Sequence, residues 1–119
     1  MSADLTATTL RYYAMVDAGD VDGVIDWFAP EATYWRPGYP PMVGREALRE
    51  FYGGERVIEY GAHTVEDLLV DGDRVAVRGR FEGELKDGST ARLGFADFLR
   101  YDGDGRVVER RSYFDTPAV

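Results

Sequence analysis

The chain has no cysteine, so neither a disulfide nor a thiolate-ligated metal site is available to it. It also has only one histidine, His63. One imidazole among scattered carboxylates is a poor metal site, because stable ligation needs several converging donors. We therefore expect no metal and no other cofactor.

Positive charge is scarce as well: 14 Lys and Arg residues stand against 22 Asp and Glu residues, for a formal net charge of -8. An excess of negative charge argues against nucleic acid and anionic membranes as partners. No apolar run approaches the roughly 20 residues of a membrane span. The first ten residues lack the charged start and apolar centre of a secretory signal. The lack of a membrane span and of a secretory signal predicts a soluble, cytoplasmic protein, although the absence of cysteine would suit a periplasm too.

The length of 119 residues suits a single domain, and no repeat, linker or low-complexity segment divides residues 1–119. Helix signals are confined to the first half of the chain. Ser2 can cap a helix from Ala3 to Ala18, and Asp20 can cap a shorter one that ends at Ala29-Pro30. A third helix is expected from Arg45 to about Tyr52, before two glycines.

Strand signals dominate the second half. A short strand is expected over Ala32–Arg36, and from Val57 onward apolar and polar residues alternate. Three acidic, glycine-containing turns divide that region into four strands joined by hairpins. The order of elements predicts an α+β domain in which helices cover one face of a curved sheet. Strong curvature would leave a pocket between the two layers, open at one end.

The stretch Thr90–Tyr101 is the clearest strand, and it places one carboxyl among apolar side chains. Alternation puts Asp97 on the same face as Leu93, Phe95 and Leu99. An unpaired carboxylate there would cost several kcal/mol or more, so Asp97 must find a donor or keep its proton.

Several segments resemble the nuclear-transport-factor-2-like (NTF2-like) superfamily, in particular its ketosteroid isomerase and SnoaL-like polyketide cyclase branches. The similar stretches are Arg11-Tyr12, Ala18–Gly23, Phe28–Thr33, Arg49–Tyr52, and Asp97 ahead of Arg100–Val108. The resemblance implies a cone-shaped fold with three N-terminal helices on a strongly curved, mostly antiparallel sheet. It also implies an enzyme that stabilises an enolate-like oxygen of a hydrophobic carbonyl substrate.

The same resemblance places Tyr12 and Asp97 on the positions of the isomerase's oxyanion hole, where a phenol and a neutral carboxyl donate hydrogen bonds. Where the isomerase has its general-base aspartate before a proline, this chain has Arg36 before Pro37. A guanidinium cannot accept a proton at neutral pH. We expect Arg36 to anchor an anion or carbonyl instead, and His63 to be the candidate base.

The expected pocket is lined by aromatic and cationic side chains. The candidate substrate-binding residues are Tyr34, Trp35, Arg36, Phe51, Phe95, Arg110 and Phe114. Each has a plainer alternative: the aromatic residues and Tyr12 can be ordinary core, His63 can be structural, and Asp97 can form a salt bridge with Arg110.

Two other functions remain open. Arg80 and Glu82 on one strand resemble the Arg and acid of limonene-epoxide hydrolases, although Ser112 stands where a second acid is needed, and hydrophobicity places the pair outside the core. The third possibility is a binding or dimerisation module without catalysis. A homodimer is expected in any case, because the uncovered face of the sheet carries Phe98, Tyr113 and, in the family register, Val75 and Val77.

Overall fold

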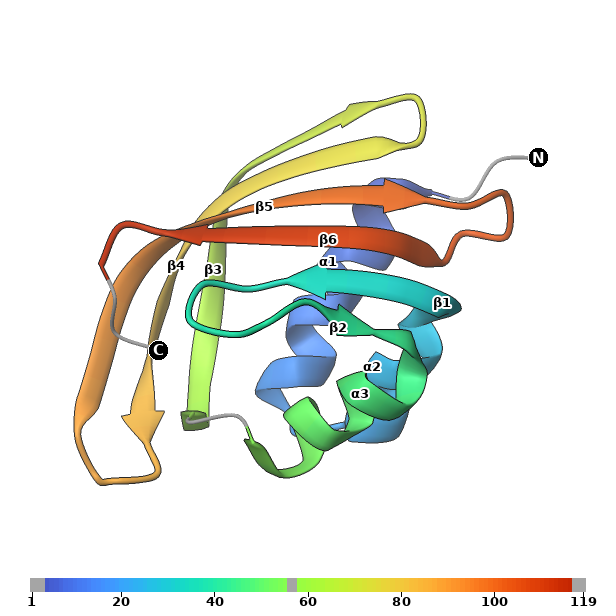
Figure 1. Ribbon diagram of the computed structural model, residues 1–119. Helices are drawn as coiled ribbons and strands as arrows, with labels where there is room; N and C mark the ends of the chain where they lie inside the picture. The colour runs from blue at the N-terminus through green and yellow to red at the C-terminus, as the bar shows by residue number, and fades with distance from the viewer. Residues whose placement is uncertain (1–3, 56–57, 117–119) are drawn as a thin grey trace.

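The computed structural model describes residues 4–55 and 58–116. The first part of the chain contains three helices, one π-helical turn and two strands: α1 (Leu5–Asp17), α2 (Val21–Trp27), β1 (Phe28–Trp35), β2 (Met42–Val43), α3 (Gly44–Glu50) and η1 (Phe51–Glu55). Four long strands follow: β3 (Ile58–Asp71), β4 (Arg74–Leu85), β5 (Thr90–Tyr101) and β6 (Val107–Phe114). Figure 1 shows their arrangement.

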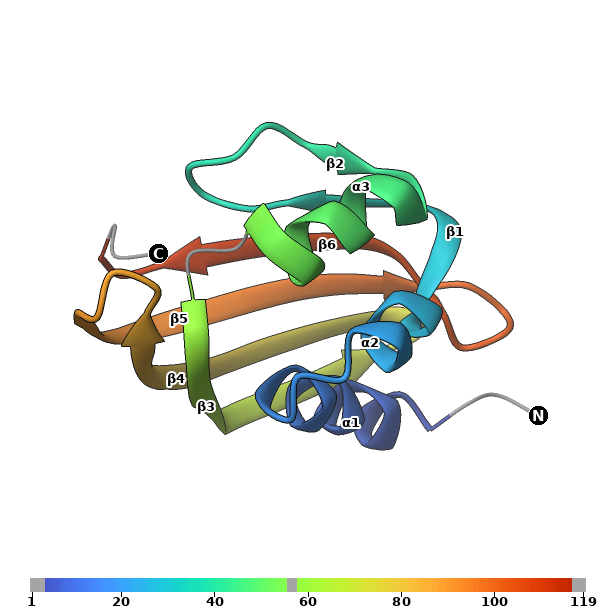
Figure 2. The same cartoon turned by 90° about the horizontal axis from the view of Figure 1, so that it is seen from below.

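The strands form one sheet in the order β2-β1-β6-β5-β4-β3. Only β1 and β6 pair in parallel, and the other neighbours are antiparallel. The sheet is bent, and the three helices lie against its concave side, with α1 next to β3 and α3 next to β1 (Figure 2). The predicted α+β fold, with helices on one face of a curved and mostly antiparallel sheet, is confirmed.

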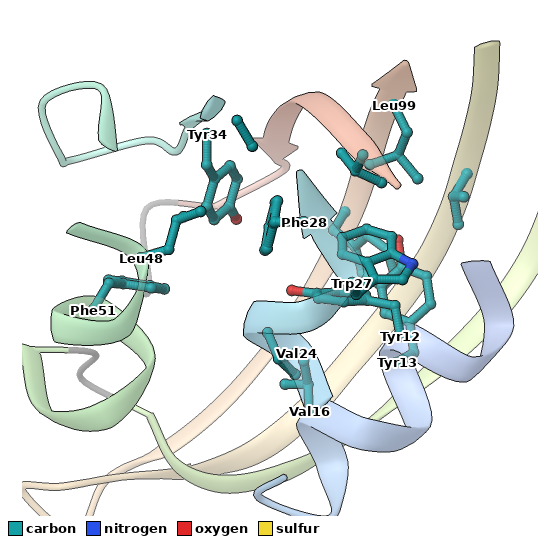
Figure 3. Close-up of a cluster of buried hydrophobic side chains, with 14 of the residues drawn as sticks. Tyr12, Tyr13, Val16, Val24, Trp27, Phe28, Tyr34, Leu48, Phe51 and Leu99 are labelled. Atoms are coloured by element: carbon teal, nitrogen blue, oxygen red, sulfur yellow. The ribbon is translucent and has the colours of Figure 1, made fainter. Parts of the chain in front are cut away.

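The core fills the space between the helices and the concave face. Tyr12 of α1 stacks on Trp27 of α2 with ring centroids 4.1 Å apart, and Phe28 meets Trp27 edge to face. Figure 3 shows this aromatic group beside Val16, Val24 and Leu99, all of them buried. Buried aromatic side chains contribute large apolar areas and favour offset or edge-to-face contacts, so this group joins α1, α2 and the sheet.

The helix boundaries differ from the sequence prediction by a few residues. Asp4 caps α1 by accepting from the Ala7 amide, whereas the predicted cap, Ser2, lies outside the described residues. Asp20 caps α2 as predicted. That helix stops at Trp27, earlier than expected, because Phe28 already belongs to β1, where it pairs with Val107.

The apolar side chains of β4 face the core, as its hydrophobic pattern predicts, and not the outer face that the family resemblance suggested. Val75 and Val77 are 2% and 3% exposed and face the helices, so their placement on the outer face was wrong. Arg80 and Glu82 are exposed on the opposite side. This orientation contradicts the hydrolase alternative, which requires both side chains inside the pocket.

Glycine allows β4 to pass close beneath the core at Gly79. A Cβ atom there would stand 2.3 Å from the Thr64 carbonyl oxygen and 2.8 Å from the ring of Phe95. Such distances force a shift of backbone as well as side chain, so the absence of a side chain is required for this close approach.

We predict that Gly79→Ala lowers the free energy of unfolding by about 1–3 kcal/mol, the usual cost of overpacking a dense interior. The control is Gly103→Ala, because a Cβ at Gly103 meets nothing within 4 Å. Urea unfolding of both variants measures the difference. Equal stabilities would show that the sheet does not need this close approach.

Candidate functional site

Asp97 lies on the concave face of β5 and is 1% exposed. Its Oδ2 accepts a hydrogen bond from the Tyr13 hydroxyl and from Arg110 Nη2, the latter at 2.9 Å. Its Oδ1 accepts one from the Ser112 hydroxyl. Tyr13 comes from α1 and the other two donors from β6, the neighbouring strand, so Asp97 ties the helix layer to the sheet.

Asp97 is therefore an ionised carboxylate. Burial alone would raise its pKa, but the Arg110 guanidinium and the hydroxyls of Ser112 and Tyr13 outweigh burial and hold the pKa below its ordinary value. The expectation of a neutral carboxyl that donates a hydrogen bond is wrong, because a cation and two hydroxyl donors already satisfy this group. The salt bridge to Arg110, the plainer alternative, is what the structure contains.

Arg110 is the centre of the buried polar network. Its guanidinium lies over the rings of Tyr12 and Tyr34, 4.6 and 4.4 Å from their centroids. Its Nη1 donates to the Tyr12 hydroxyl and, at 2.8 Å, to the Tyr52 hydroxyl. Burial disfavours its charge, but Asp97 and the surrounding tyrosines raise its pKa well above the ordinary value. Arg110 therefore stays cationic.

The hydroxyls of Tyr12 and Tyr52 together have one hydrogen that donates to no acceptor among the described residues. Their oxygens are 2.6 Å apart and both accept from Arg110. One hydroxyl donates to the other, which leaves the second hydroxyl hydrogen without an acceptor among the described residues. Burial raises the pKa of Tyr12 well above 10, so its phenol stays protonated. The pair can donate one hydrogen bond to a ligand, strengthened by the cation behind it.

A second chain of hydrogen bonds begins at Arg36. Its Nη1 donates to the Tyr34 hydroxyl at 3.0 Å, and that hydroxyl is 2.9 Å from Ser112 Oγ. Because the hydrogen of Ser112 goes to Asp97, Tyr34 must donate to Ser112. The two arginines thus converge on one carboxylate, one directly and one through two hydroxyls.

His63 of β3 is held by Asp17, the last residue of α1. Asp17 accepts from His63 Nδ1 at 2.6 Å and from the His63 backbone amide at 3.0 Å. A carboxylate on Nδ1 fixes the ring and, in the neutral imidazole, places the proton on that nitrogen. Nε2 then carries the free lone pair. Asp17 and Tyr13 lie one turn apart on α1, so one face of this helix holds both His63 and Asp97.

A narrow cavity connects these groups. Its lining contains Tyr12, Val16, Arg36, Tyr52, Ile58, His63, Phe81, Leu93, Phe95, Asp97, Arg110 and Phe114. The centre of a water molecule can occupy about 20 Å³ of this cavity. The total atom-free space is about 390 Å³, but that larger value includes solvent at the mouth. About one water fits as the side chains stand. A larger ligand requires wall residues to move, and Arg36, Tyr52 and Phe114 are only partly buried.

The structure brings most, but not all, of the predicted site residues together. Tyr12, Arg36, His63, Phe95, Asp97, Arg110 and Phe114 share the cavity. Tyr34 and Phe51 are fully buried behind it, and Trp35 stacks against Arg111, whose guanidinium carbon is 3.8 Å from the ring centroid. Tyr12 does not contact Asp97 directly; Tyr13, its neighbour on the helix, does.

Sequence reasoning missed Tyr13, Asp17 and Tyr52. A helical spacing of four residues relates Tyr13 to Asp17 and could have suggested a shared face. No local pattern indicates Tyr52, because a π-helical turn positions it after α3 has ended.

Two further findings concern the described residues as a whole. Within residues 4–55 and 58–116, no three His, Asp or Glu side chains gather where a metal ion could be held. No helix in the same part of the chain is long and apolar enough to cross a membrane.

The fold is a curved, mostly antiparallel sheet with three helices on its concave face and a buried polar network between the two layers. The family model for the SnoaL-like domain matches residues 9–110. This chain therefore belongs to the SnoaL-like domain family.

Three solved structures illustrate proteins that share this fold. The epoxide hydrolase/cyclase-like enzyme SalBIII of pyran ring formation in salinomycin is 22% identical, with a TM-score of 0.83 over 96% of this chain and 92% of that chain. TerC, co-crystallised with polyporic acid, is 23% identical, with a TM-score of 0.82 over 95% of this chain and 92% of that chain. A Catenulispora acidiphila protein with a ketosteroid isomerase-like fold, in complex with trimethylamine, is 19% identical, with a TM-score of 0.81 over 100% and 91%.

We predict that Arg110→Met lowers the free energy of unfolding by about 3–5 kcal/mol at pH 7, because it leaves Asp97 buried without its cation. In the parent protein, the pKa of Asp97 is lower in the folded state than in the unfolded state, where it is about 3.9. Asp97 therefore stabilises the fold at pH values above about 3.9, and this stabilisation is lost as the pH falls through the folded-state pKa. In the variant, burial raises this pKa. The loss of stability should therefore be largest at neutral pH and shrink toward pH 4.

Denaturant unfolding of both proteins between pH 4 and pH 8 provides the measurement. Arg111→Met is the matched control, since Arg111 is exposed on the same strand. A difference between Arg110→Met and the parent that does not change with pH would contradict the ion-pair account.

Proposed function

We propose that this protein is an enzyme of the ketosteroid isomerase and polyketide cyclase type, acting on a hydrophobic carbonyl compound through an enolate. The observation that carries the proposal is the shared cavity. It holds a candidate base, His63 oriented by Asp17, and a candidate enolate site, the Tyr12 and Tyr52 hydroxyls backed by Arg110. SalBIII and TerC support the class by fold similarity alone.

In the proposed reaction, Nε2 of His63 removes a proton from the carbon next to the carbonyl. The electrons of the broken C–H bond form a C=C bond, and the carbonyl oxygen takes up negative charge. The free hydroxyl hydrogen of the Tyr12 and Tyr52 pair bonds to that oxygen, and the Arg110 cation stabilises its charge. Protonated His63 then returns a proton to carbon, at the same or another position. Alternatively, the enolate carbon attacks a second carbonyl, whose C=O π electrons move to its oxygen, and that oxygen takes the proton from His63.

The narrow cavity favours a second candidate function, a binding or dimerisation module without catalysis. Room for about one water is what a filled core leaves, and the polar network satisfies much of its own hydrogen bonding. This alternative assigns His63, Asp97 and Arg110 to stability alone. It differs from the enzyme in predicting no reaction with any enolisable compound.

We also propose that two copies associate through the outer face of the sheet. Phe98 and Tyr113 are 52% and 54% exposed and meet edge to face, with ring centroids 5.9 Å apart. Leu69 on β3 is 70% exposed. A cluster of large apolar side chains on an uncovered sheet is typical of a protein interface.

The enzyme proposal predicts that the protein accelerates exchange of deuterium from solvent into the α-carbons of 2-tetralone, a hydrophobic enolisable ketone. His63→Asn should lower the rate at least about 100-fold, the ordinary contribution of a general base. Asp17→Asn should cause a smaller loss, because the ring stays but its orientation and tautomer are no longer fixed. Proton NMR in D₂O follows the exchange.

Thr64→Asn is the control, because Thr64 neighbours His63 on β3 and points to solvent. It should exchange 2-tetralone at the parent rate. A parent protein no faster than His63→Asn would reject the enzyme and leave the binding module.

For self-association, we expect Phe98→Asp to convert a dimer into a monomer by burying a charge in the interface. Sedimentation velocity measures the change, and Thr64→Asn again serves as the control. A monomeric parent protein at micromolar concentration would contradict the proposed dimer.

A further inference from the structure

Arg36 is a half-buried cation with no carboxylate partner among the described residues. It follows Trp35, the last residue of β1, and lines the cavity. No carboxylate of the described residues lies within salt-bridge distance of its guanidinium, whereas Arg110 has Asp97. In the described network there are two guanidinium groups and one carboxylate.

The donors of Arg36 are also mostly unused. A guanidinium has five N–H groups, and one of them donates to a described acceptor, the Tyr34 hydroxyl. Its Nε is buried and has no partner there. Leaving a buried donor unsatisfied costs free energy, and an unpaired buried charge costs more. A ligand that supplies the missing acceptor would remove this cost.

The surroundings of Arg36 suit a flat, apolar compound that carries an acid. The guanidinium carbon lies 5.2 Å from the ring centroid of Phe51 and 4.9 Å from that of Phe114. These rings hold the guanidinium between them but provide no negative charge. A planar guanidinium binds a carboxylate through two parallel hydrogen bonds, which an aromatic ring cannot replace.

Among the described residues, no hydrogen bond joins Arg36 directly to the proposed enolate site. Arg110 and the Tyr12 and Tyr52 hydroxyls form one donor group. Among the described residues, the hydrogen bonds that link Arg36 to this group run through Tyr34, Ser112 and Asp97, and the Tyr34 ring also lies against the Arg110 guanidinium. A ligand with two polar ends could therefore contact both donor groups at once.

We propose that Arg36 binds an anionic group of the ligand, a carboxylate or an acidic enol, at a point distinct from the reacting carbonyl. The substrate class is thus a hydrophobic, aromatic-sized carbonyl compound that carries its own negative charge. This inference rests on the proposed function for the reacting carbonyl, but the anion site itself is testable without any reaction. It also explains how an acidic protein can select an acidic ligand: the local charge of the cavity is positive although the net charge is -8.

The test compares two ligands of the same shape, 2-naphthoate and its neutral analogue 2-naphthamide, by isothermal titration calorimetry at pH 7. The parent protein should bind naphthoate about 10- to 100-fold more tightly, as a charge-assisted pair of hydrogen bonds provides. Arg36→Gln should abolish the preference. Arg36→Lys should keep part of it, because it retains the charge without the two-pronged geometry.

Arg111→Gln is the matched control: Arg111 neighbours Arg110 in sequence but lines a groove on the outer face of the sheet. It should keep the full preference, which excludes binding in that groove. The inference is overturned if the parent protein shows no preference for naphthoate, or if Arg36→Gln retains it. His63→Asn separates the two proposals, since it should lose deuterium exchange and still prefer naphthoate.

Discussion

The ion pair of Asp97 and Arg110 is the interaction on which the rest of the site depends. Both side chains are nearly inaccessible to water, so neither charge is tolerable without the other. Asp97 joins α1 to β6 through Tyr13 and Ser112, while Arg110 holds the hydroxyls of Tyr12 and Tyr52 side by side. The Asp97 carboxylate therefore positions the Arg110 guanidinium, the Tyr12 and Tyr52 hydroxyls and helix α1.

In the proposed mechanism, this arrangement takes the place of a neutral acid. A neutral carboxyl would donate a hydrogen bond itself. Here the carboxylate is ionised and forms an ion pair with Arg110. Arg110 in turn donates to the hydroxyls of Tyr12 and Tyr52 and polarises them. The position that lacks a general-base aspartate carries Arg36, and the base is proposed on another strand, at His63. Under the proposed function, the base and the enolate site therefore lie at positions different from those of the isomerase.

The architecture was predictable because its signals are local. Asp20 capped its helix as expected, and the acidic turns divided the second half of the chain into the four strands that the structure contains. Alternation in Thr90–Tyr101 placed Asp97 inside. The protonation state of Asp97 was not predictable in this way, because it depends on Arg110, thirteen residues later and on the neighbouring strand.

Other parts of the site were missed for a similar reason. The pairing of Asp17 with His63 joins residues 46 positions apart, and the meeting of Tyr12 with Tyr52 joins residues 40 apart. A β-bulge between Val65 and Asp67 also breaks the alternation of β3, so that Leu68 packs against the core and Leu69 is exposed. Periodicity places a residue on a face, but which partners it meets is decided by curvature and register.

The central claim is that Arg110 and the Tyr12 and Tyr52 hydroxyls together favour negative charge on a bound oxygen. The absorption spectrum of bound 2-naphthol, titrated with pH, tests it most directly, since the phenol and phenolate forms absorb at different wavelengths. The account predicts that binding lowers the pKa of 2-naphthol, so that phenolate is present at a pH where the free compound is neutral. A bound naphthol that stays neutral up to its solution pKa would contradict it.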